Sequence, residues 1–305
     1  MIEAVISVLP VYFFILLGFI AKKSFKNEIN ERTLVLLSLY FFQPILIFWG
    51  LTKSPINYEF VASPIIYLLI VLGVLLFLIP AARLIFKERT DQSIYLAVAL
   101  VGNTGNLGIP LGIALFGMES VPYTSIINIA NIIFIYIFSV YFFAREQFAL
   151  KDALLSILKI PGIWFALLAL LVNYNDITIN KHIYTALEMG AYTSMVIQLL
   201  IFGIYLSSVK VRTMPWYSSL HLSFIKHILL PVVGIIVVVN FTDLNPFVAK
   251  ILILELMVPL AVNNVNLAAL YNCKPYDVAA SILISSALFV GLLTFYIYVI
   301  DYFIK

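Results

Sequence analysis

The residues Val101-Gly102-Asn103-Thr104-Gly105-Asn106-Leu107-Gly108-Ile109-Pro110-Leu111 interrupt a long apolar segment that extends from residue 93 to residue 116. Glycine weakens a helix interior, and proline removes a backbone hydrogen-bond donor. Inside lipid, freed backbone groups are tolerated only where protein or a watery cavity satisfies them. We therefore predict a membrane helix broken near mid-depth, which in transporters marks the binding site. The alternative is a kinked helix whose glycines let neighbouring helices pack closely.

The composition is that of an integral membrane protein. The 305-residue chain is 63% hydrophobic and 11% charged, whereas soluble domains are roughly 45–50% apolar and about 25% charged. The single cysteine, Cys273, cannot form an intramolecular disulfide, and the three histidines lie far apart without metal-ligand spacing. The net charge of +3 does not indicate nucleic-acid binding, because the basic residues lie between apolar segments, where they set membrane topology.

The pattern predicts an all-α integral membrane protein with ten spanning helices. Since roughly 20 apolar residues make one span, we expect helices at about 5–21, 33–51, 62–82, 92–118, 122–144, 154–172, 186–208, 221–240, 246–271 and 278–300. The first segment is not interpreted as a signal peptide, because no basic residues precede it and Lys22-Lys23 follows it.

The ninth segment mirrors the fourth. Residues 258–266 read Val-Pro-Leu-Ala-Val-Asn-Asn-Val-Asn, so a proline and an asparagine cluster again lie near mid-depth. Asparagine facing lipid is expensive, so these side chains should face the protein interior. The alternative is that they only hydrogen-bond neighbouring helices, at ~0.6 kcal/mol per bond. Asn103 and Asn263 are 160 residues apart (263 − 103), about half the chain. The spacing predicts two five-helix repeats, residues 1–145 and 153–305, the second inverted in the membrane.

The basic residues predict the orientation. Most of the 18 Lys and Arg residues fall in loops that follow odd-numbered predicted helices. The positive-inside rule then places both termini on the non-cytoplasmic side.

Few charged residues fall inside the predicted spans. Glu255 lies four residues before Pro259, so the two share one helix face. A membrane-buried carboxylate is a functional candidate, and we consider it as a coupling residue or proton carrier, as a Na⁺ ligand or as a structural partner. Lys226 is expected to extend to the membrane interface, and His227 is expected to be a hydrogen-bonded interfacial residue rather than a ligand. No cationic side chain is therefore expected at mid-depth.

The breaks suggest anion binding. Pro110 suits the first turn of a half-helix, whose positive dipole end would point into the membrane centre. Free N–H groups together with Asn and Thr side chains suit a carboxylate or another small anion. The predicted substrate-binding residues are Asn103, Thr104, Asn106, Pro110, Pro259, Asn263, Asn264 and Asn266.

The sequence does not indicate an enzyme. It contains no His-Glu-x-x-His, Gly-x-Ser-x-Gly or phosphate-binding P-loop motif. No catalytic residue, metal site or cofactor is predicted, and coupling to H⁺ or Na⁺ is left open.

The segment from Asn103 to Pro110, together with Pro259-Leu260-Ala261-Val262-Asn263-Asn264, resembles the auxin efflux carrier family, which includes the plant PIN carriers and many prokaryotic relatives. The resemblance covers essentially the whole chain and implies a prokaryotic-type member. Asn103 and Thr104 match the Asn-Thr of the plant Asn-Pro-Asn-Thr-Tyr motif. Gly102 and Gly105 stand where the plant carriers have Pro and Tyr, which argues against auxin as the substrate.

The resemblance also implies an architecture and a mechanism. The fold of this chain would be related to that of the bile-acid sodium symporters, with broken helices four and nine crossing at the substrate site. A scaffold domain (helices 1, 2, 6 and 7) and a transport domain (helices 3–5 and 8–10) would move against each other as an elevator. The family also implies a homodimer, and its prokaryotic members are usually assigned to malate or malonate.

The resulting hypothesis is a secondary active transporter in the plasma membrane for a small organic anion such as a carboxylate. The direction of transport is left open, and efflux is one candidate. Two alternatives remain. One is a Na⁺-coupled organic anion symporter: Glu255 resembles the acidic Na⁺ ligand of the bile-acid symporters, although the Gln pattern around that ligand is missing. The other is a membrane sensor that binds a ligand without transporting it. The expected partners are the lipid bilayer and a second copy of the chain, and no nucleic acid.

Overall fold

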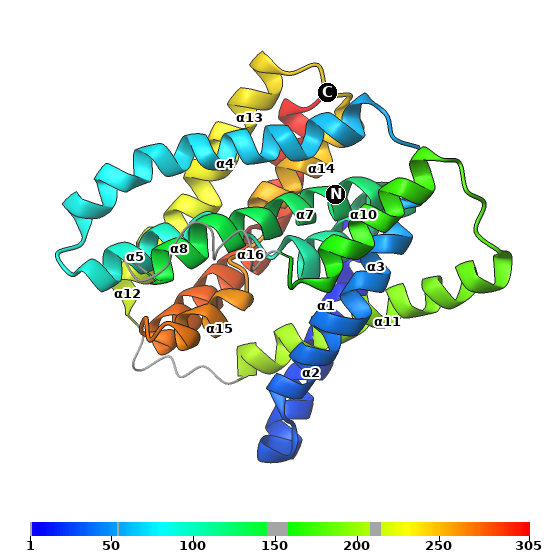
Figure 1. Ribbon diagram of the computed structural model, residues 1–305. Coiled ribbons are helices and arrows are strands. Elements are labelled where there is room, and N and C mark those ends of the chain that lie inside the picture. Colours follow the sequence, from blue (N-terminus) through cyan, green and yellow to red (C-terminus); the bar gives the residue numbers. More distant parts are fainter. Residues whose placement is uncertain (1, 54, 145–157, 208–214) are drawn as a thin grey trace.

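A computed structural model describes residues 2–53, 55–144, 158–207 and 215–305, and these residues form a bundle of helices (Figure 1). Within these ranges, β-structure is limited to an isolated antiparallel bridge between Gly102 and Leu260. The prediction of an all-α fold is therefore confirmed.

The first half of the chain contains long helices, short π-helical turns (η2, η3 and η5) and short 3-10 turns (η1 and η4). Its elements are α1 (Ile2–Phe25), η1 (Lys26–Glu28), α2 (Glu31–Leu37), η2 (Ser38–Phe42), α3 (Gln43–Leu51), α4 (Tyr58–Ile85), α5 (Arg89–Val98), η3 (Thr104–Gly108), α6 (Ile109–Phe116), η4 (Met118–Ser120), α7 (Val121–Phe134), η5 (Ile135–Ser139) and α8 (Val140–Ala144).

The second half begins in the described residues with α10. Its elements are α10 (Pro161–Tyr174), α11 (Lys181–Ser207), α12 (Trp216–Phe224), η8 (Ile225–Leu229), α13 (Leu230–Phe241), α14 (Pro246–Met257), α15 (Asn263–Leu270) and α16 (Pro275–Phe303). Helix is present in each of the ten predicted ranges. The boundary between the predicted repeats and the predicted start of the sixth segment, at residue 154, lie outside the described residues.

Asparagine caps begin several of these helices. The Asn57 side chain accepts a hydrogen bond from the Phe60 N–H (2.8 Å) at the start of α4, and Asn245 accepts one from the Val248 N–H (2.9 Å) at the start of α14. Each cap satisfies one of the N–H groups that a helix start leaves without an intrahelical partner. Pro246 follows the second cap at a position where its missing donor costs nothing.

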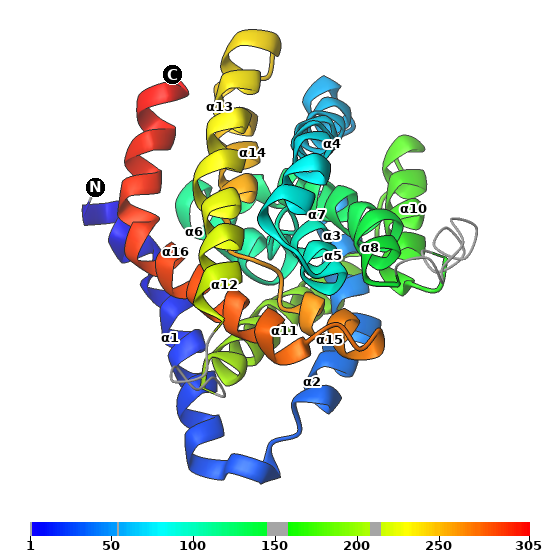
Figure 2. The same ribbon diagram turned by 90° about the vertical axis from the view of Figure 1, so that its left-hand side faces the viewer.

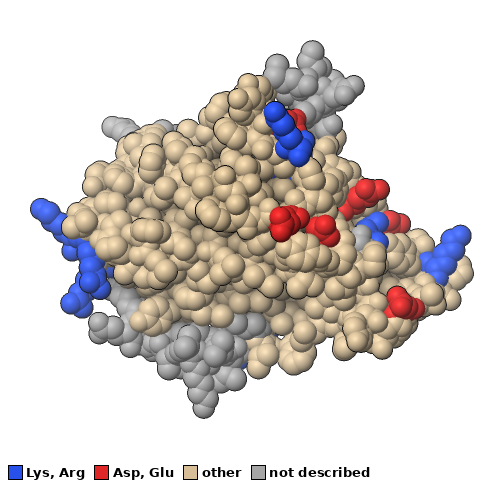
Figure 3. Space-filling view, turned by 90° about the horizontal axis from the view of Figure 1, so that it is seen from above, with Lys and Arg blue, Asp and Glu red and all other residues tan. Residues whose placement is uncertain are grey.

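Six helical segments in the described part of the chain are long and apolar enough to cross a bilayer: 31–51, 58–85, 118–144, 181–207, 216–241 and 275–303. In the view of Figure 3 most of the described surface is uncharged, with Lys and Arg at its left edge and Asp, Glu, Lys and Arg side chains scattered over its right-hand part. Exposed Leu, Phe and Ile side chains cover much of these helices, for example Phe77 and Leu84 on α4. A large apolar surface of this kind suits a lipid environment, so the chain is a multi-pass membrane protein. The ten-span inverted repeat remains a prediction.

The helices pack in two groups. In one, α1 packs against α11, and α3 packs against α10 and α11. In the other, α4 packs against α7 and α13, α12 packs against α16, and α14 packs against α7, α13 and α16. Figure 2 shows α13, α14 and α16 side by side, with α1 next to α16.

An ion-pair cluster joins the start of α5 to the turn before α16. Lys274 Nζ lies 2.8 Å from Glu88 Oε2 and 2.6 Å from Asp91 Oδ1. The hydrogen bond and the charge of Lys274 lower the pKa of Glu88 below its ordinary value of 4.5. Burial lowers the pKa of Lys274, but its hydrogen bonds to Asp91 and Glu88 outweigh burial and raise the pKa overall.

We expect Lys274→Met to lower the thermal unfolding temperature at neutral pH by a small amount, because exposed ion pairs contribute little. The folded state lowers the Glu88 pKa, so this stabilisation is present above pH 4.5 and is lost as the pH falls through the lowered pKa. Thermal unfolding in detergent should therefore separate the variant from the wild type by more at pH 7 than at pH 3. An equal difference at both pH values would contradict the assignment.

Candidate functional site

Two interruptions of the helical backbone meet at the centre of the molecule. Helix α5 ends at Val98, and helical structure resumes at Thr104; α14 ends at Met257, and α15 begins at Asn263. The Asn103 N–H donates to the Pro259 carbonyl (2.8 Å), and the Ala261 N–H donates to the Val101 carbonyl (3.0 Å). Each interruption thus satisfies backbone groups that the other leaves free, which is what non-helical backbone inside a membrane protein requires.

A side chain from a third helix completes this pairing. The Leu260 N–H donates to Ser285 Oγ on α16 (3.1 Å). Pro110 lies near the start of α6, but η3 already forms helix directly before it, so Pro110 does not begin the half-helix as expected.

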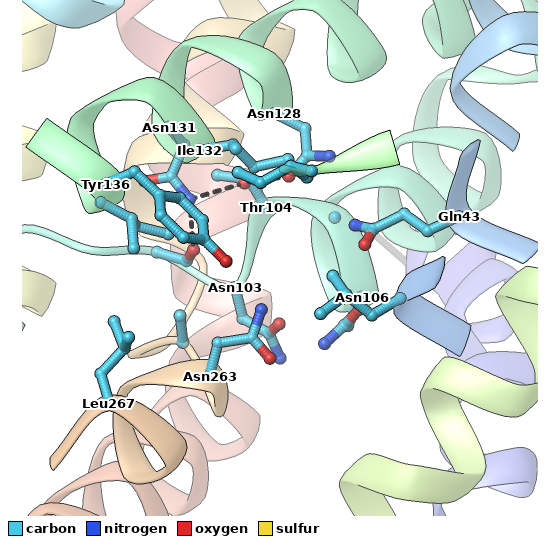
Figure 4. Close-up of a pocket in the computed structure, with 16 residues that line it drawn as sticks. Gln43, Asn103, Thr104, Asn106, Asn128, Asn131, Ile132, Tyr136, Asn263 and Leu267 are labelled. Atoms are coloured by element: carbon cyan, nitrogen blue, oxygen red, sulfur yellow. Dashed lines mark hydrogen bonds between the residues drawn. The ribbon is translucent and has the colours of Figure 1, made fainter. Parts of the chain in front are cut away.

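A cavity of about 90 Å³ opens beside the paired breaks (Figure 4). Its walls come from both breaks, from α7 and η5, and from η2, α3 and the residue before α10. The lining residues are Leu39, Gln43, Gly102, Asn103, Thr104, Gly105, Asn106, Asn128, Asn131, Ile132, Ile135, Tyr136, Ile160, Ala261, Asn263 and Leu267.

A directional chain of hydrogen bonds orients the polar wall of the cavity. The Gly102 carbonyl can only accept, so the Asn131 Nδ2 that lies 2.8 Å from it donates. The same Nδ2 donates to Thr104 Oγ1 (3.0 Å), whose hydroxyl donates to Asn128 Oδ1 (2.9 Å). The Tyr67 hydroxyl donates to Asn131 Oδ1 (3.1 Å). This chain fixes the Asn128 amide with its oxygen occupied and its nitrogen free to donate.

Two amide donors in the cavity wall are left without partners. Asn103 Nδ2 and Asn128 Nδ2 are both buried and have no hydrogen-bond partner among the described residues. A buried donor without a partner costs about 1–3 kcal/mol. The cavity wall therefore presents donors that a ligand with acceptor oxygens would satisfy.

Four of the eight predicted binding residues line the cavity: Asn103, Thr104, Asn106 and Asn263. Asn103 and Asn263 enter it from the two different breaks (Figure 4). The other predicted residues are placed differently. Pro110 is buried in α6, Pro259 contributes its carbonyl to the backbone pairing, and Asn264 is fully buried with neither side-chain polar atom bonded to a described residue. Asn266 belongs to α15, but its side chain lies outside the described part of the structure.

The cavity also contains polar residues that the sequence interpretation did not assign to it. These are Asn128 and Asn131 on α7, Gln43 on α3 and Tyr136 on η5. Asn128 and Asn131 are three residues apart, a spacing that places both side chains on one helix face. That spacing, in a segment already predicted to span the membrane, was the signal that could have identified them.

The predicted position of Lys226 is wrong. Its side chain is 0% exposed and does not extend to an interface. An ideal Cβ built on Gly102 would lie 2.7 Å from Lys226 Nζ, so the ammonium group lies against the first break. The expectation that no cationic side chain lies at this depth is wrong for the same reason. The segment begins at Trp216 rather than near residue 221, which places Lys226 well inside it.

Glu255 is also 0% exposed, and it lies against η3, the turn that follows the same break. A Cβ on Gly108 would overlap its carboxylate oxygens. Neither oxygen has a hydrogen-bond partner among the described residues. His227, by contrast, is buried and satisfied, because Nε2 bonds Ser285 Oγ (2.8 Å) and Nδ1 bonds the Tyr296 hydroxyl (2.9 Å).

The described residues contain no group of three or more His, Cys, Asp or Glu side chains that could hold a metal ion. The long apolar helices, the paired breaks and the small polar cavity between them are the features of a membrane transport protein. The chain belongs to the membrane transport protein family, whose sequence pattern matches residues 3–297. This is the family of the auxin efflux carriers, so the resemblance found in the sequence is confirmed. A comparison with curated proteins gives no match.

Proposed function

We propose that this protein is a secondary active transporter for a small organic anion such as a carboxylate. The observation that carries the proposal is the pair of buried, unpartnered amide donors, Asn103 Nδ2 and Asn128 Nδ2, in the wall of the cavity beside the breaks. None of the described residues that line the cavity is acidic. A site with free donors and no negative charge favours an anion with acceptor oxygens.

The size of the cavity supports a compact substrate. Its volume is about 90 Å³, well below the roughly 300–1,000 Å³ of pockets for drug-sized ligands. Small mono- and dicarboxylates therefore fit this proposal better than a larger aromatic acid such as indole-3-acetate.

An elevator mechanism forms part of the proposal. The group containing α1, α3, α10 and α11 would be the scaffold, and the group containing α4, α7, α14 and α16 would move with the breaks. The support is that Leu39, Gln43 and Ile160 reach the cavity from the scaffold side, whereas the other lining residues come from the breaks and from α7 and η5. A substrate there would be bound between the two groups, as alternating access requires.

The proposal also includes coupling through Glu255, a plasma-membrane location with both termini outside the cytoplasm, and a homodimer. A buried carboxylate without a hydrogen-bond partner is a candidate proton carrier. Its two free oxygens also suit a cation ligand, so a Na⁺-coupled symporter is the second candidate.

Transport in proteoliposomes tests the proposal. Uptake of radiolabelled malate, malonate and indole-3-acetate would be measured with and without imposed H⁺ and Na⁺ gradients. We expect saturable uptake of a small carboxylate, and the gradient that accelerates it identifies the coupling ion. Ligand-induced stabilisation without uptake, by folded and inserted protein, would favour a sensor instead.

Asn103→Ala and Asn263→Ala should each abolish the thermal stabilisation that a carboxylate ligand produces in detergent. Each substitution removes a polar side chain from a different wall of the cavity, and a lost hydrogen bond to a charged ligand costs about 1.5–3 kcal/mol, or roughly ten- to a hundredfold in affinity. Asn240→Ala is the matched control, because Asn240 is exposed and bonds only its own helix at the Ile236 carbonyl. Wild-type ligand shifts in both cavity variants would place the binding site elsewhere.

A further inference from the structure

Lys226 and Glu255 are two buried groups of opposite charge behind the substrate cavity, which interact electrostatically without a hydrogen bond or an ion-pair contact between them. Both side chains are 0% exposed. Lys226 Nζ and both carboxylate oxygens of Glu255 lack hydrogen-bond partners among the described residues. A buried charge without compensating hydrogen bonds is expensive, so a pair of this kind indicates a function rather than a contribution to stability.

The backbone of the first break separates this pair from the cavity. Lys226 Nζ lies against Gly102 in the break, and the Glu255 carboxylate lies against Gly108, the last residue of the η3 turn that follows the break. Gly102 also lines the cavity, whereas neither Lys226 nor Glu255 does. The two charges therefore act on a bound ligand through space, without touching it.

Other titratable groups near the pair are already committed to hydrogen bonds. Tyr67 of α4 interacts electrostatically with Glu255, but its hydroxyl donates to Asn131. His227 interacts electrostatically with Lys226, and its ring nitrogens bond Ser285 and Tyr296 of α16. The charge behind the cavity is thus set by Lys226 and Glu255 themselves.

We propose that Lys226 is the cation that attracts the substrate anion to the cavity, and that protonation of Glu255 switches this attraction on. The inference rests on the proposed function. With the Glu255 carboxylate ionised, the pair is neutral as a whole, and the cavity has little attraction for an anion. When Glu255 takes a proton from water, Lys226 is left uncompensated and the pair carries a single positive charge.

This arrangement couples one proton to one negative charge. Electrostatic attraction is strong in a site of low dielectric constant, so an anion binds better to the protonated protein. By linkage, the bound anion favours protonation of Glu255 to the same extent. Proton and anion would then be carried together and released together, when Glu255 ionises on the opposite side of the membrane.

Calorimetric titration with malonate, malate and indole-3-acetate tests the coupling, using two buffers of different ionisation enthalpy to count protons. For the wild type, we expect about one proton taken up per anion in the pH range where Glu255 is ionised in the free protein and protonated with the anion bound, and none at lower pH, where Glu255 already carries the proton. Glu255→Gln should bind without proton uptake and with an affinity that does not vary with pH. Lys226→Met should weaken binding at least about tenfold at every pH. Lys250→Met is the control, because it removes a partly exposed lysine that is paired with Asp301 outside the cavity.

Thermal unfolding without ligand tests the pair itself. Removing one member leaves the other charge buried and uncompensated, so Lys226→Met and Glu255→Gln should each lower the unfolding temperature more than the double substitution does. If the shift of the double variant equals the sum of the two single shifts, the inference is overturned. This comparison needs no ligand binding, so it holds even where a single variant is too destabilised to bind ligand.

The outcomes separate this inference from the proposed function. Binding to the wild type with unchanged affinity in Lys226→Met, or unchanged proton uptake in Glu255→Gln, overturns the inference alone. No binding of any probe to folded wild-type protein overturns the proposed substrate class and the inference with it.

Discussion

Gly108→Ala is expected to reduce transport at least about tenfold, because the new methyl group would overlap the Glu255 carboxylate. The backbone at Gly108 has φ −60° and ψ −49°, which any residue adopts, so the effect comes from the contact and not from backbone strain. Glu255 is fully buried and has little room to move aside. Forcing an extra methyl group into a packed interior costs about 1–3 kcal/mol.

The chain offers matched controls for this substitution. Gly73 in α4 and Gly291 in α16 have no atom within 4 Å of an added Cβ. Alanine at either position should leave transport unchanged and stabilise the helix, since glycine is about 1 kcal/mol less favourable than alanine in a helix interior. Initial rates in proteoliposomes and unfolding temperatures in detergent would be measured for all three variants. A Gly108→Ala protein that matches the wild type in both would show that the carboxylate does not lie against Gly108.

Asn131→Leu is expected to destabilise the protein by at least about 2 kcal/mol and to remove ligand binding, because it leaves several buried polar groups without partners. Asn131 holds the Gly102 carbonyl, the Thr104 hydroxyl and the Tyr67 hydroxyl together. Leucine has a similar size, so the loss is one of hydrogen bonding rather than volume. Without this amide, Thr104 loses the donor that orients its own hydroxyl toward Asn128.

A double-mutant cycle with Tyr67→Phe isolates this network. In the wild type, removing the Tyr67 hydroxyl leaves Asn131 Oδ1 without its donor, whereas in the Asn131→Leu background it removes an orphaned hydroxyl. Tyr67→Phe should therefore cost less in the second background than in the first. Equal costs measured by thermal or denaturant unfolding would mean that this hydrogen bond contributes nothing.

The cavity shows how far a sequence pattern can locate a site. Asn103, Thr104, Asn106 and Asn263 were identified because glycine, proline and asparagine within apolar runs are conspicuous in a membrane helix. Asn128, Asn131 and Gln43 lie in helices that continue through their positions, so no break marks them, and the only local signal is the three-residue spacing of Asn128 and Asn131. Pro259 was predicted to bind substrate, but it does not line the cavity and instead supplies a backbone carbonyl to the pairing of the breaks.

Local physical chemistry was sufficient for the class of protein and the positions of its helical segments. Long apolar runs form spanning helices, and glycine, asparagine and proline interrupt them. Both effects are local and do not depend on tertiary contacts. Which break pairs with which, and which side chains face the cavity, depends on contacts between residues distant in sequence. The hydrogen bond from Asn103 to Pro259 is such a contact.

Lys226 shows most directly what tertiary structure alone decided. A lysine in an apolar helix can extend to an interface or be buried beside an opposite charge, and its own sequence neighbourhood is the same in both cases. Only the packing of η8 beside α14 and the first break places Lys226 Nζ against Gly102. The depth of a charged side chain is thus set by the elements that surround it, because they determine whether water or protein is within its reach.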